Sequence, residues 1–155
     1  MFQFECGVVI ATHRPATPED ATRLFELRRK SIIAFAPSGM SVLEAEIWAA
    51  NLTVPGMQLK IREMEIWVAE ISGRMVAWGA IRGDRLEGLY TDPEFASQGI
   101  GSELLIKLEA LMRARGIRRI SADASSNAEG FYLRRGYEPT GPRRGEVRQI
   151  TKLLA

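Results

Sequence analysis

The residues best placed to do chemistry lie in two glycine-marked turns. The first turn runs from Asp92 to Ser102, with the sequence Asp-Pro-Glu-Phe-Ala-Ser-Gln-Gly-Ile-Gly-Ser, and leads directly into a strong helix pattern. A strand, a glycine turn and a helix start in this order point several free backbone N–H groups, and the positive end of the helix dipole, at one spot. Such a spot binds phosphate. Side chains in place of Gly99 and Gly101 would keep a pyrophosphate away from the backbone.

The spacing of the first turn separates it from two common phosphate-binding loops. A P-loop ends in Gly-Lys-Ser/Thr, whereas this turn ends in Gly-Ile-Gly-Ser and has no lysine. A dinucleotide-binding fingerprint needs a third glycine, and Leu104 stands at that position. The remaining interpretations are a phosphate site of another kind and an ordinary glycine turn before a helix.

The second turn begins at Ser125, and together the two turns resemble motifs A and B of the GNAT superfamily of acetyltransferases. Motif A, Arg/Gln-x-x-Gly-x-Gly/Ala, matches Gly99 and Gly101, although Ala96 stands where the family has Arg or Gln. Motif B, Asn-x-x-Ala-x-x-x-Tyr-x-x-x-Gly-Phe/Tyr, is matched by Ala128, Tyr132, Gly136 and Tyr137, with Ser125 at the Asn position and an asparagine displaced to Asn127. The resemblance covers residues 8–154 in element order, and its specific part is residues 86–137.

This resemblance implies an N-acetyltransferase that moves the acetyl group of acetyl-CoA, its cosubstrate, to a primary amine by direct attack in a ternary complex, without a metal. It implies that Tyr132 is the acid for the departing thiolate. A phenol with a pKa of about 10 can protonate a thiolate whose pKa resembles the cysteine value of about 8.5. It places the CoA-binding residues at Leu89, Tyr90, Thr91, Ser97, Gln98, Gly99, Ile100, Gly101, Ser102, Ser125, Asn127 and Tyr132. Tyr132 as a core ring bonded to a backbone carbonyl, and Ser102 as a simple helix cap, are the alternatives.

The general base is less well defined. Glu87 lies two residues before Leu89 on a predicted strand, so regular alternation would put both side chains on one face, leading into the site. Glu87 as a solvated strand residue, Asp123 as the base, and no protein base at all are the alternatives. For the acceptor, the resemblance implies a side lined by the first two helices, with Phe35 and Trp48 as candidate substrate contacts. The acceptor itself, a small amine or a protein N-terminus or lysine, is not encoded in a recognisable motif.

The elements that position these residues follow from apolar spacing and turn signals. A first strand is predicted at 8–11, ending at His13-Arg14-Pro15, and a helix follows from a Thr17 cap. Ser41 caps a second helix with Leu43, Ile47 and Trp48 as its apolar face, and a short helix covers 57–64 after a break at Pro55-Gly56. From there the pattern predicts three antiparallel strands at 65–71, 75–81 and 85–91, a helix at 99–115, a strand at 117–124, a helix at 127–135, and strands on either side of 141–145.

The helix between the strands at 85–91 and 117–124 makes a βαβ crossover, so these two strands should be parallel. The expected fold is therefore α/β (α+β), a mixed but mostly antiparallel central sheet with helices on both faces, as in the GNAT fold. We expect a single domain over residues 1–155.

Composition limits the other functions. Apolar residues make up 46% and charged residues 26%, which is typical of a soluble globular protein, and no apolar run is long enough to cross a membrane. A net charge of +2 argues against nucleic acid or membrane partners. One cysteine and one histidine exclude an internal disulfide and disfavour a multi-histidine metal site. With no secretion signal, we expect a cytoplasmic enzyme, and a homodimer through the C-terminal strands is possible. A non-catalytic acyl-CoA-binding sensor is the alternative function.

Overall fold

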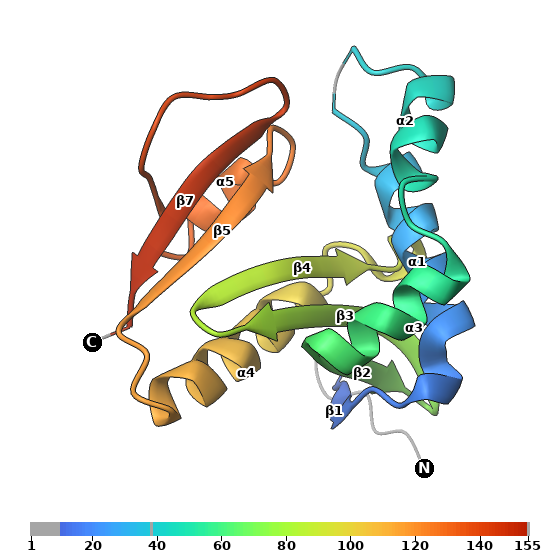
Figure 1. Ribbon diagram of the computed structural model, residues 1–155, viewed down its shortest axis with the longest axis horizontal. Helices are drawn as coiled ribbons and strands as arrows, with labels where there is room; N and C mark the ends of the chain where they lie inside the picture. The colour runs from blue at the N-terminus through green and yellow to red at the C-terminus, as the bar shows by residue number, and fades with distance from the viewer. Residues whose placement is uncertain (1–9, 38, 155) are drawn as a thin grey trace.

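The computed structural model describes residues 10–37 and 39–154, which form a seven-stranded sheet covered by helices (Figure 1). The strands are β1 (Thr12–Pro15), β2 (Glu65–Ile71), β3 (Arg74–Arg82), β4 (Arg85–Thr91), β5 (Arg119–Ser125), β6 (Glu138–Pro139) and β7 (Val147–Leu153). The α-helices are α1 (Ala21–Ala34), α2 (Val42–Ala49), α3 (Val54–Glu63), α4 (Ile100–Ala114) and α5 (Glu129–Leu133), with 3₁₀ turns η1 (Pro18–Asp20) and η2 (Pro93–Phe95).

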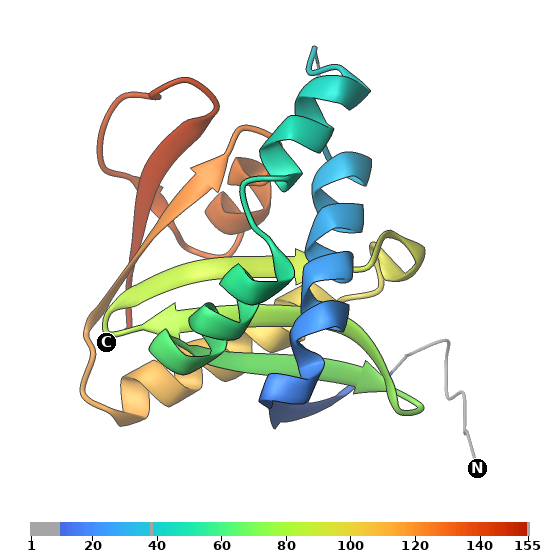
Figure 2. The ribbon, with the colours of Figure 1, turned by 45° about the vertical axis from the view of Figure 1, so that its right-hand side comes forward.

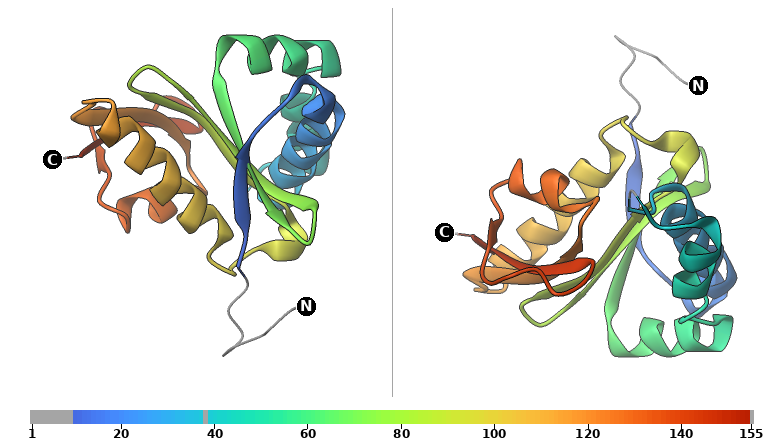
Figure 3. Two further views of the ribbon diagram at one scale, coloured as in Figure 1. Left: turned by 90° about the horizontal axis from the view of Figure 1, so that it is seen from below. Right: turned by 90° about the horizontal axis from the view of Figure 1, so that it is seen from above.

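The sheet has the order β1-β2-β3-β4-β5-β7-β6. Only β4 and β5 are parallel, and every other neighbouring pair is antiparallel. Helices α1 and α3 lie on one face of the sheet and α4 lies on the other (Figure 3). The predicted fold class and the predicted crossover are therefore confirmed.

The three-stranded meander has the boundaries that the sequence predicts for β2 and β4. Its first hairpin turns at Ser72 and Gly73, whose φ angles of 54° and 77° suit the two-residue turn that matches strand twist. A positive φ also occurs at the end of α4, where Gly116, with φ of 83°, is the left-handed residue that follows the helix.

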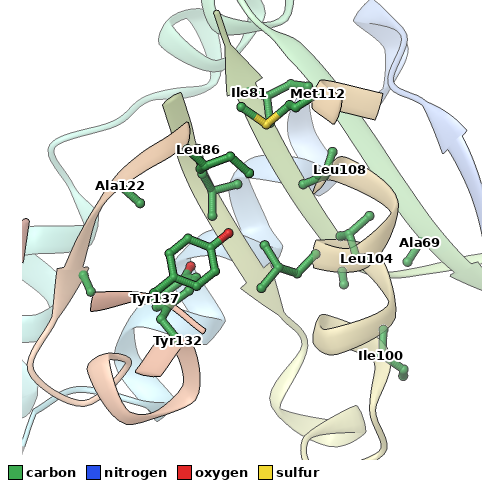
Figure 4. Packing of buried hydrophobic residues seen from close by; sticks show 14 of the residues in the cluster. Ala69, Ile81, Leu86, Ile100, Leu104, Leu108, Met112, Ala122, Tyr132 and Tyr137 are labelled. Atoms are coloured by element: carbon green, nitrogen blue, oxygen red, sulfur yellow. The ribbon is translucent and has the colours of Figure 1, made fainter. Parts of the chain in front are cut away.

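Two apolar clusters hold the helices onto the sheet. One cluster packs α4, through residues such as Leu104, Leu108 and Met112, against β3, β4 and β5 (Figure 4). The other packs α1 and α3 onto the opposite face around Trp78, whose Nε1 donates to the Leu24 carbonyl at 3.0 Å. Both layers meet at β3 and β4, so these strands are fixed from both sides.

A buried polar group ties the C-terminal strand to α4. The Tyr137 hydroxyl donates to Glu109 at 2.8 Å, and Lys152 donates to both oxygens of the same carboxylate at 3.1 Å. Burial, followed by the nearby Glu109 charge and its hydrogen bond, raises the pKa of the Tyr137 phenol. This phenol therefore stays protonated and serves as a structural donor.

Three predicted elements are wrong in detail. The first strand is Thr12–Pro15 rather than 8–11, of which residues 8 and 9 lie outside the described part of the chain; Pro15 is tolerated because β1 is an edge strand. Pro55 and Gly56 do not break the chain but lie in the first turn of α3, where Thr53 accepts from the Gly56 N–H at 3.1 Å.

The apolar face predicted for α2 is also wrong. Ser41 does cap this helix, accepting from the Glu44 N–H at 3.0 Å, but Leu43 and Ile47 are 66% and 61% exposed. The fully buried residues of α2 are Ala45 and Ala49, and α1 packs against this helix. Leu43 and Ile47 point outward instead, whereas Trp48 is half-buried.

Candidate active site

Strands β4 and β5 diverge along their length (Figures 1 and 2), and the residues between them line a cleft. The two strands pair only at Arg85 with Ser121 and Leu86 with Ala122. Beyond this point β4 continues along β3 to Thr91, while β5 continues along β7 to Ser125. The diverging strands form the walls of a cleft of about 600 Å³, within the range of about 300–1,000 Å³ that is usual for ligand pockets.

The first glycine turn lies at one end of this cleft. Ser97 and Gly99 both have left-handed backbone conformations, with φ of 61° and 81°, and α4 begins at the next residue, Ile100. At Gly101 a Cβ would come within 3.0 Å of the Thr91 hydroxyl. The backbone at the start of α4 is therefore uncovered where it lines the cleft, which is the arrangement that a diphosphate requires.

A buried carboxylate supports this turn from behind. Asp92 is fully buried, and its carboxylate accepts from the Glu94 N–H at 3.0 Å and from Arg23 at 3.1 Å. Lys30 adds an ion pair at 3.3 Å. Burial alone would raise the pKa of the Asp92 carboxyl, but these hydrogen bonds hold it below its usual range. Because Arg23 and Lys30 belong to α1, Asp92 joins that helix to the turn that leads into α4.

Two arginines at the end of α5 add positive charge to the same part of the cleft. Arg135 stacks over the Phe131 ring at 3.7 Å and donates to the Ser102 hydroxyl at 3.0 Å. Arg134 lines the cleft beside it. Ser102 accordingly belongs both to the first turn of α4 and to a cationic edge, and guanidinium groups at such an edge favour phosphate oxygens.

Tyr132 lies on α5 and lines the cleft. Its ring packs edge-on against Phe131 and Tyr137, with ring centroids 5.2 and 5.3 Å away. Burial, with a smaller contribution from Tyr90, raises the pKa of the Tyr132 phenol. Within the described residues no protein group hydrogen-bonds its hydroxyl, in contrast to that of Tyr137. A protonated and uncommitted phenol beside the cleft can donate a proton to a bound ligand.

The face on which Glu87 lies differs from the prediction. Ala80 pairs with Gly88 and Ile81 with Leu86, so Glu87 is the extra residue of a β-bulge in β4. Leu86 and Leu89 consequently both pack toward α4, whereas Glu87 faces the side of α1 and α3, next to Tyr90. Glu87 still lines the cleft, and its carboxylate lies 3.5 Å from Arg85.

Asp123, the other candidate base, lies across the cleft on β5. Its carboxylate is paired with Arg85 at 3.1 Å and its side chain is 54% exposed. Arg85 thus lies between the two acids. Glu87, with a side chain only 20% exposed, is the more enclosed of the two.

The far wall joins residues from distant parts of the chain. Ser125 donates to the Asn127 side chain at 2.7 Å, and the Asn127 amide donates to the carbonyl of Phe35 at the end of α1. Phe35 and Trp48, predicted on the acceptor side, line the same cleft. The loop after β5 and the helix α1 therefore meet over one end of it.

The structure brings nearly all of the predicted site residues to one cleft. Only Gln98 is absent from its lining, and its side chain is exposed. Sequence reasoning missed Asp92 as the support of the turn and the buried Ser31 as a lining residue. The Asp-Pro pair at 92–93 marks a turn start, but no local pattern shows that Arg23, Lys30 and Arg74 surround the Asp92 carboxylate.

Two features are absent from residues 10–37 and 39–154. These residues contain no group of three or more His, Cys, Asp or Glu side chains able to hold a metal ion. In the same ranges no helix combines the length and apolar character needed to cross a membrane.

Comparison with known proteins defines the class. Residues 38–150 match the family model of the GNAT acetyltransferase domain. The uncharacterised N-acetyltransferase YafP of Escherichia coli K12 is 24% identical over 131 residues, covering 84% of this chain and 83% of that protein. The peptidyl-lysine N-acetyltransferase YjaB of Salmonella typhimurium is 32% identical over 91 residues, 58% of this chain and 60% of that protein.

Solved structures agree with this class. A GCN5-related N-acetyltransferase from Rhodopseudomonas palustris aligns with a TM-score of 0.87 at 26% identity, covering 94% of this chain and 97% of that one. PaiA N-acetyltransferase from Thermoplasma acidophilum, solved with coenzyme A, aligns with a TM-score of 0.81 at 21% identity, covering 94% and 99%.

The family model and the shared fold thus define an acyltransferase. The chain belongs to the GNAT acetyltransferase family, and it is an acetyl-CoA-dependent N-acetyltransferase.

Proposed function

We propose that this enzyme transfers the acetyl group of acetyl-CoA to a primary amine by direct attack within a ternary complex. In this reaction a bond forms between the amine nitrogen and the acetyl carbon, and the carbon–sulfur bond breaks. The amine loses a proton to a base and the departing thiolate gains one from an acid. No covalent enzyme intermediate is needed.

The observation that carries the proposal is the separation of β4 from β5 with a phosphate-facing turn at one end and a free phenol between the strands. The backbone N–H groups of residues 97–102 would hold the diphosphate, with Arg135 beside them. The unpaired edge of β4 at Leu89, Tyr90 and Thr91 would hydrogen-bond the pantetheine arm. Ser125 and Asn127 line the opposite wall.

The two proton-transfer roles go to residues of opposite walls. Tyr132 is the acid, because burial keeps its phenol protonated and the described residues leave its hydroxyl without a protein partner. Glu87 is the base, because it lines the cleft at the bulge and is more enclosed than Asp123. Phe35 and Trp48 then line the acceptor side.

For the acceptor we propose a small-molecule amine or a protein amine such as a lysine side chain. The Salmonella relative, named for action on peptidyl-lysine, supports the second type. The exposed end of the cleft near Phe35 and Trp48 supports access for either type.

To test this function, the protein is incubated with acetyl-CoA and a panel of amines, and the rate of free thiol release is measured. We expect at least one amine to raise thiol release well above the rate without amine, together with an N-acetylated product seen by mass spectrometry. Calorimetry with CoA and with ADP runs in parallel, and we expect CoA to bind more tightly because ADP lacks the pantetheine arm. Saturable CoA binding without amine-dependent thiol release would indicate the acyl-CoA sensor instead.

A further inference from the structure

A second cavity of about 210 Å³ lies on the other side of β4 from α4. Arg28 of α1 and Lys60 of α3 line it from above, and its floor comes from β3 and β4. Figure 2 shows α3 lying across the sheet beside α1, the two helices that flank this space. The cavity shares Glu87 and Tyr90 with the main cleft, so the two spaces adjoin at the bulge of β4.

The charge in this cavity is unbalanced. Among the described residues, no acidic side chain lies within 4.0 Å of the charged groups of Arg28 or Lys60. The one carboxylate in its lining, Glu87, makes its ion pairs with Arg82 and Arg85 instead. Arg28 donates to the Ala49 carbonyl at 3.0 Å, which leaves four of its five N–H groups free of recorded partners. Two half-buried cations facing one space favour an anion between them.

The floor of the cavity is apolar. Tyr90 and Trp78 pack with ring centroids 4.7 Å apart, and Arg28 lies over the Tyr90 ring at 5.8 Å. Met64 and Ala80 complete this surface. The volume far exceeds the roughly 15 Å³ that a single water molecule requires. Cations above an aromatic and aliphatic floor suit an organic anion, with a carboxylate on an apolar stem, better than a bare inorganic ion.

We infer that this cavity binds the carboxylate of the acceptor, so that the preferred acceptor is a small amine carrying a carboxylate, as in an amino acid. The inference rests on the proposed function. The amine of such a molecule would lie at Glu87, where the cavity meets the main cleft, and its carboxylate would lie between Arg28 and Lys60. Arg28 and Lys60 are then specificity-determining residues and Glu87 sets the distance between the two ends of the acceptor.

The test compares an amino acid with the corresponding amino acid amide by the ratio of their kcat/KM values, each calculated for the neutral amine so that the different amine pKa values do not enter the ratio. A carboxylate held by two cations should give the wild type a ratio of about 10 to 100 in favour of the acid. The double variant Arg28→Met, Lys60→Met keeps the length of both stems and should bring the ratio close to one. Arg62→Met, an exposed neighbour on α3, is the matched control and should keep the wild-type ratio.

Two results would overturn the inference: a wild-type ratio near or below one, or a ratio that the double variant leaves unchanged. If the double variant fails to fold, Lys60→Met alone replaces it, with an expected loss of about tenfold in the ratio. A calorimetric titration of the protein with the N-acetylated amino acid, in the presence of CoA, separates this inference from the proposed function, because it measures binding without turnover. Saturable binding that needs Arg28 and Lys60, in a protein that turns over no amine, would support the carboxylate site and reject the transferase reaction.

Discussion

Removing the hydroxyl of Tyr132 tests the proposed chemistry most directly. The described structure records no hydrogen bond to this hydroxyl, and the ring is held by Phe131 and Tyr137 through edge contacts that a phenylalanine would also make. The substitution Tyr132→Phe should therefore keep the fold and the CoA site. Loss of a positioned general acid costs about 10²–10⁴-fold in rate, so we expect kcat to fall by that factor.

The substitution Tyr137→Phe is the matched control, because the two tyrosines pack together but differ in their partners. The Tyr137 hydroxyl donates to the buried Glu109 carboxylate at 2.8 Å. A hydrogen bond to a charged group contributes about 1.5–3 kcal/mol. For a domain of this size the loss should lower Tm by about 5–9 °C. Below its unfolding temperature, Tyr137→Phe should retain turnover.

The assays are steady-state thiol release, calorimetric titration with CoA, and thermal unfolding. The direction of the Tyr132 pKa adds a further expectation: because the phenol titrates above its ordinary value of about 10, its deprotonation should not lower wild-type kcat at any pH below about 10. The reasoning is refuted if Tyr132→Phe keeps more than a tenth of wild-type kcat. It is equally refuted if this variant loses CoA affinity or Tm as strongly as turnover, because a packing role would then explain the loss.

Three further predictions concern the other parts of the site. The substitution Glu87→Gln should lower kcat/KM for an alkyl amine about 10²–10³-fold at pH 7.4, because only about one amine in a thousand is neutral at this pH. Near pH 10, kcat/KM of the variant should recover to within about tenfold of wild type. A loss that does not change with pH would contradict a role as base. In Gly101→Val, the new Cβ would meet the Thr91 hydroxyl at 3.0 Å, so the Kd for CoA measured by calorimetry should rise by about tenfold or more. For Asp92→Asn, the native carboxyl has a lowered pKa, so the ionised carboxylate stabilises the fold. This stabilisation is fully present above the pKa of the unfolded chain, about 3.9, and is lost as the pH falls through the pKa of the folded protein. The free energy of unfolding measured in urea should therefore be about 1–3 kcal/mol lower for the variant than for wild type at pH 7, and this difference should shrink below about pH 4. An equal difference at both pH values would contradict this role.

The parts of the fold that the sequence predicts best are those set by local physics. The meander from 65 to 91 consists of β-formers bounded by glycine turns, and both β2 and β4 begin and end where the pattern places them. The helix after Gly99 has a glycine at each end and one apolar stripe, and it spans Ile100–Ala114 against a predicted 99–115. These elements lie on either side of the glycine turn at 97–99, so the position of this turn could be predicted with them.

The parts that were missed depend on the neighbours of an element. Leu43 and Ile47 form an apolar pair at helical spacing, yet Ala45 and Ala49 face α1. The spacing shows that a stripe exists, but the partner helix decides which residues of α2 are buried. The bulge at Glu87 also could not be predicted from the strand alone, because it arises from a mismatch in the pairing of β3 with β4.

That bulge connects the two cavities. Without an extra residue, regular alternation would place Glu87 and Leu89 on the α4 face together, and the cavity beneath α1 and α3 would have no acid from β4. With it, Glu87 lines the cavity beneath α1 and α3 while Leu86 and Leu89 keep their packing against α4. The strand edge that β5 leaves unpaired begins at this same point, directly after Leu86. One irregular residue therefore separates the cleft in which we propose that the cosubstrate binds from the cavity in which we propose that the acceptor carboxylate binds, and Glu87 lines both spaces.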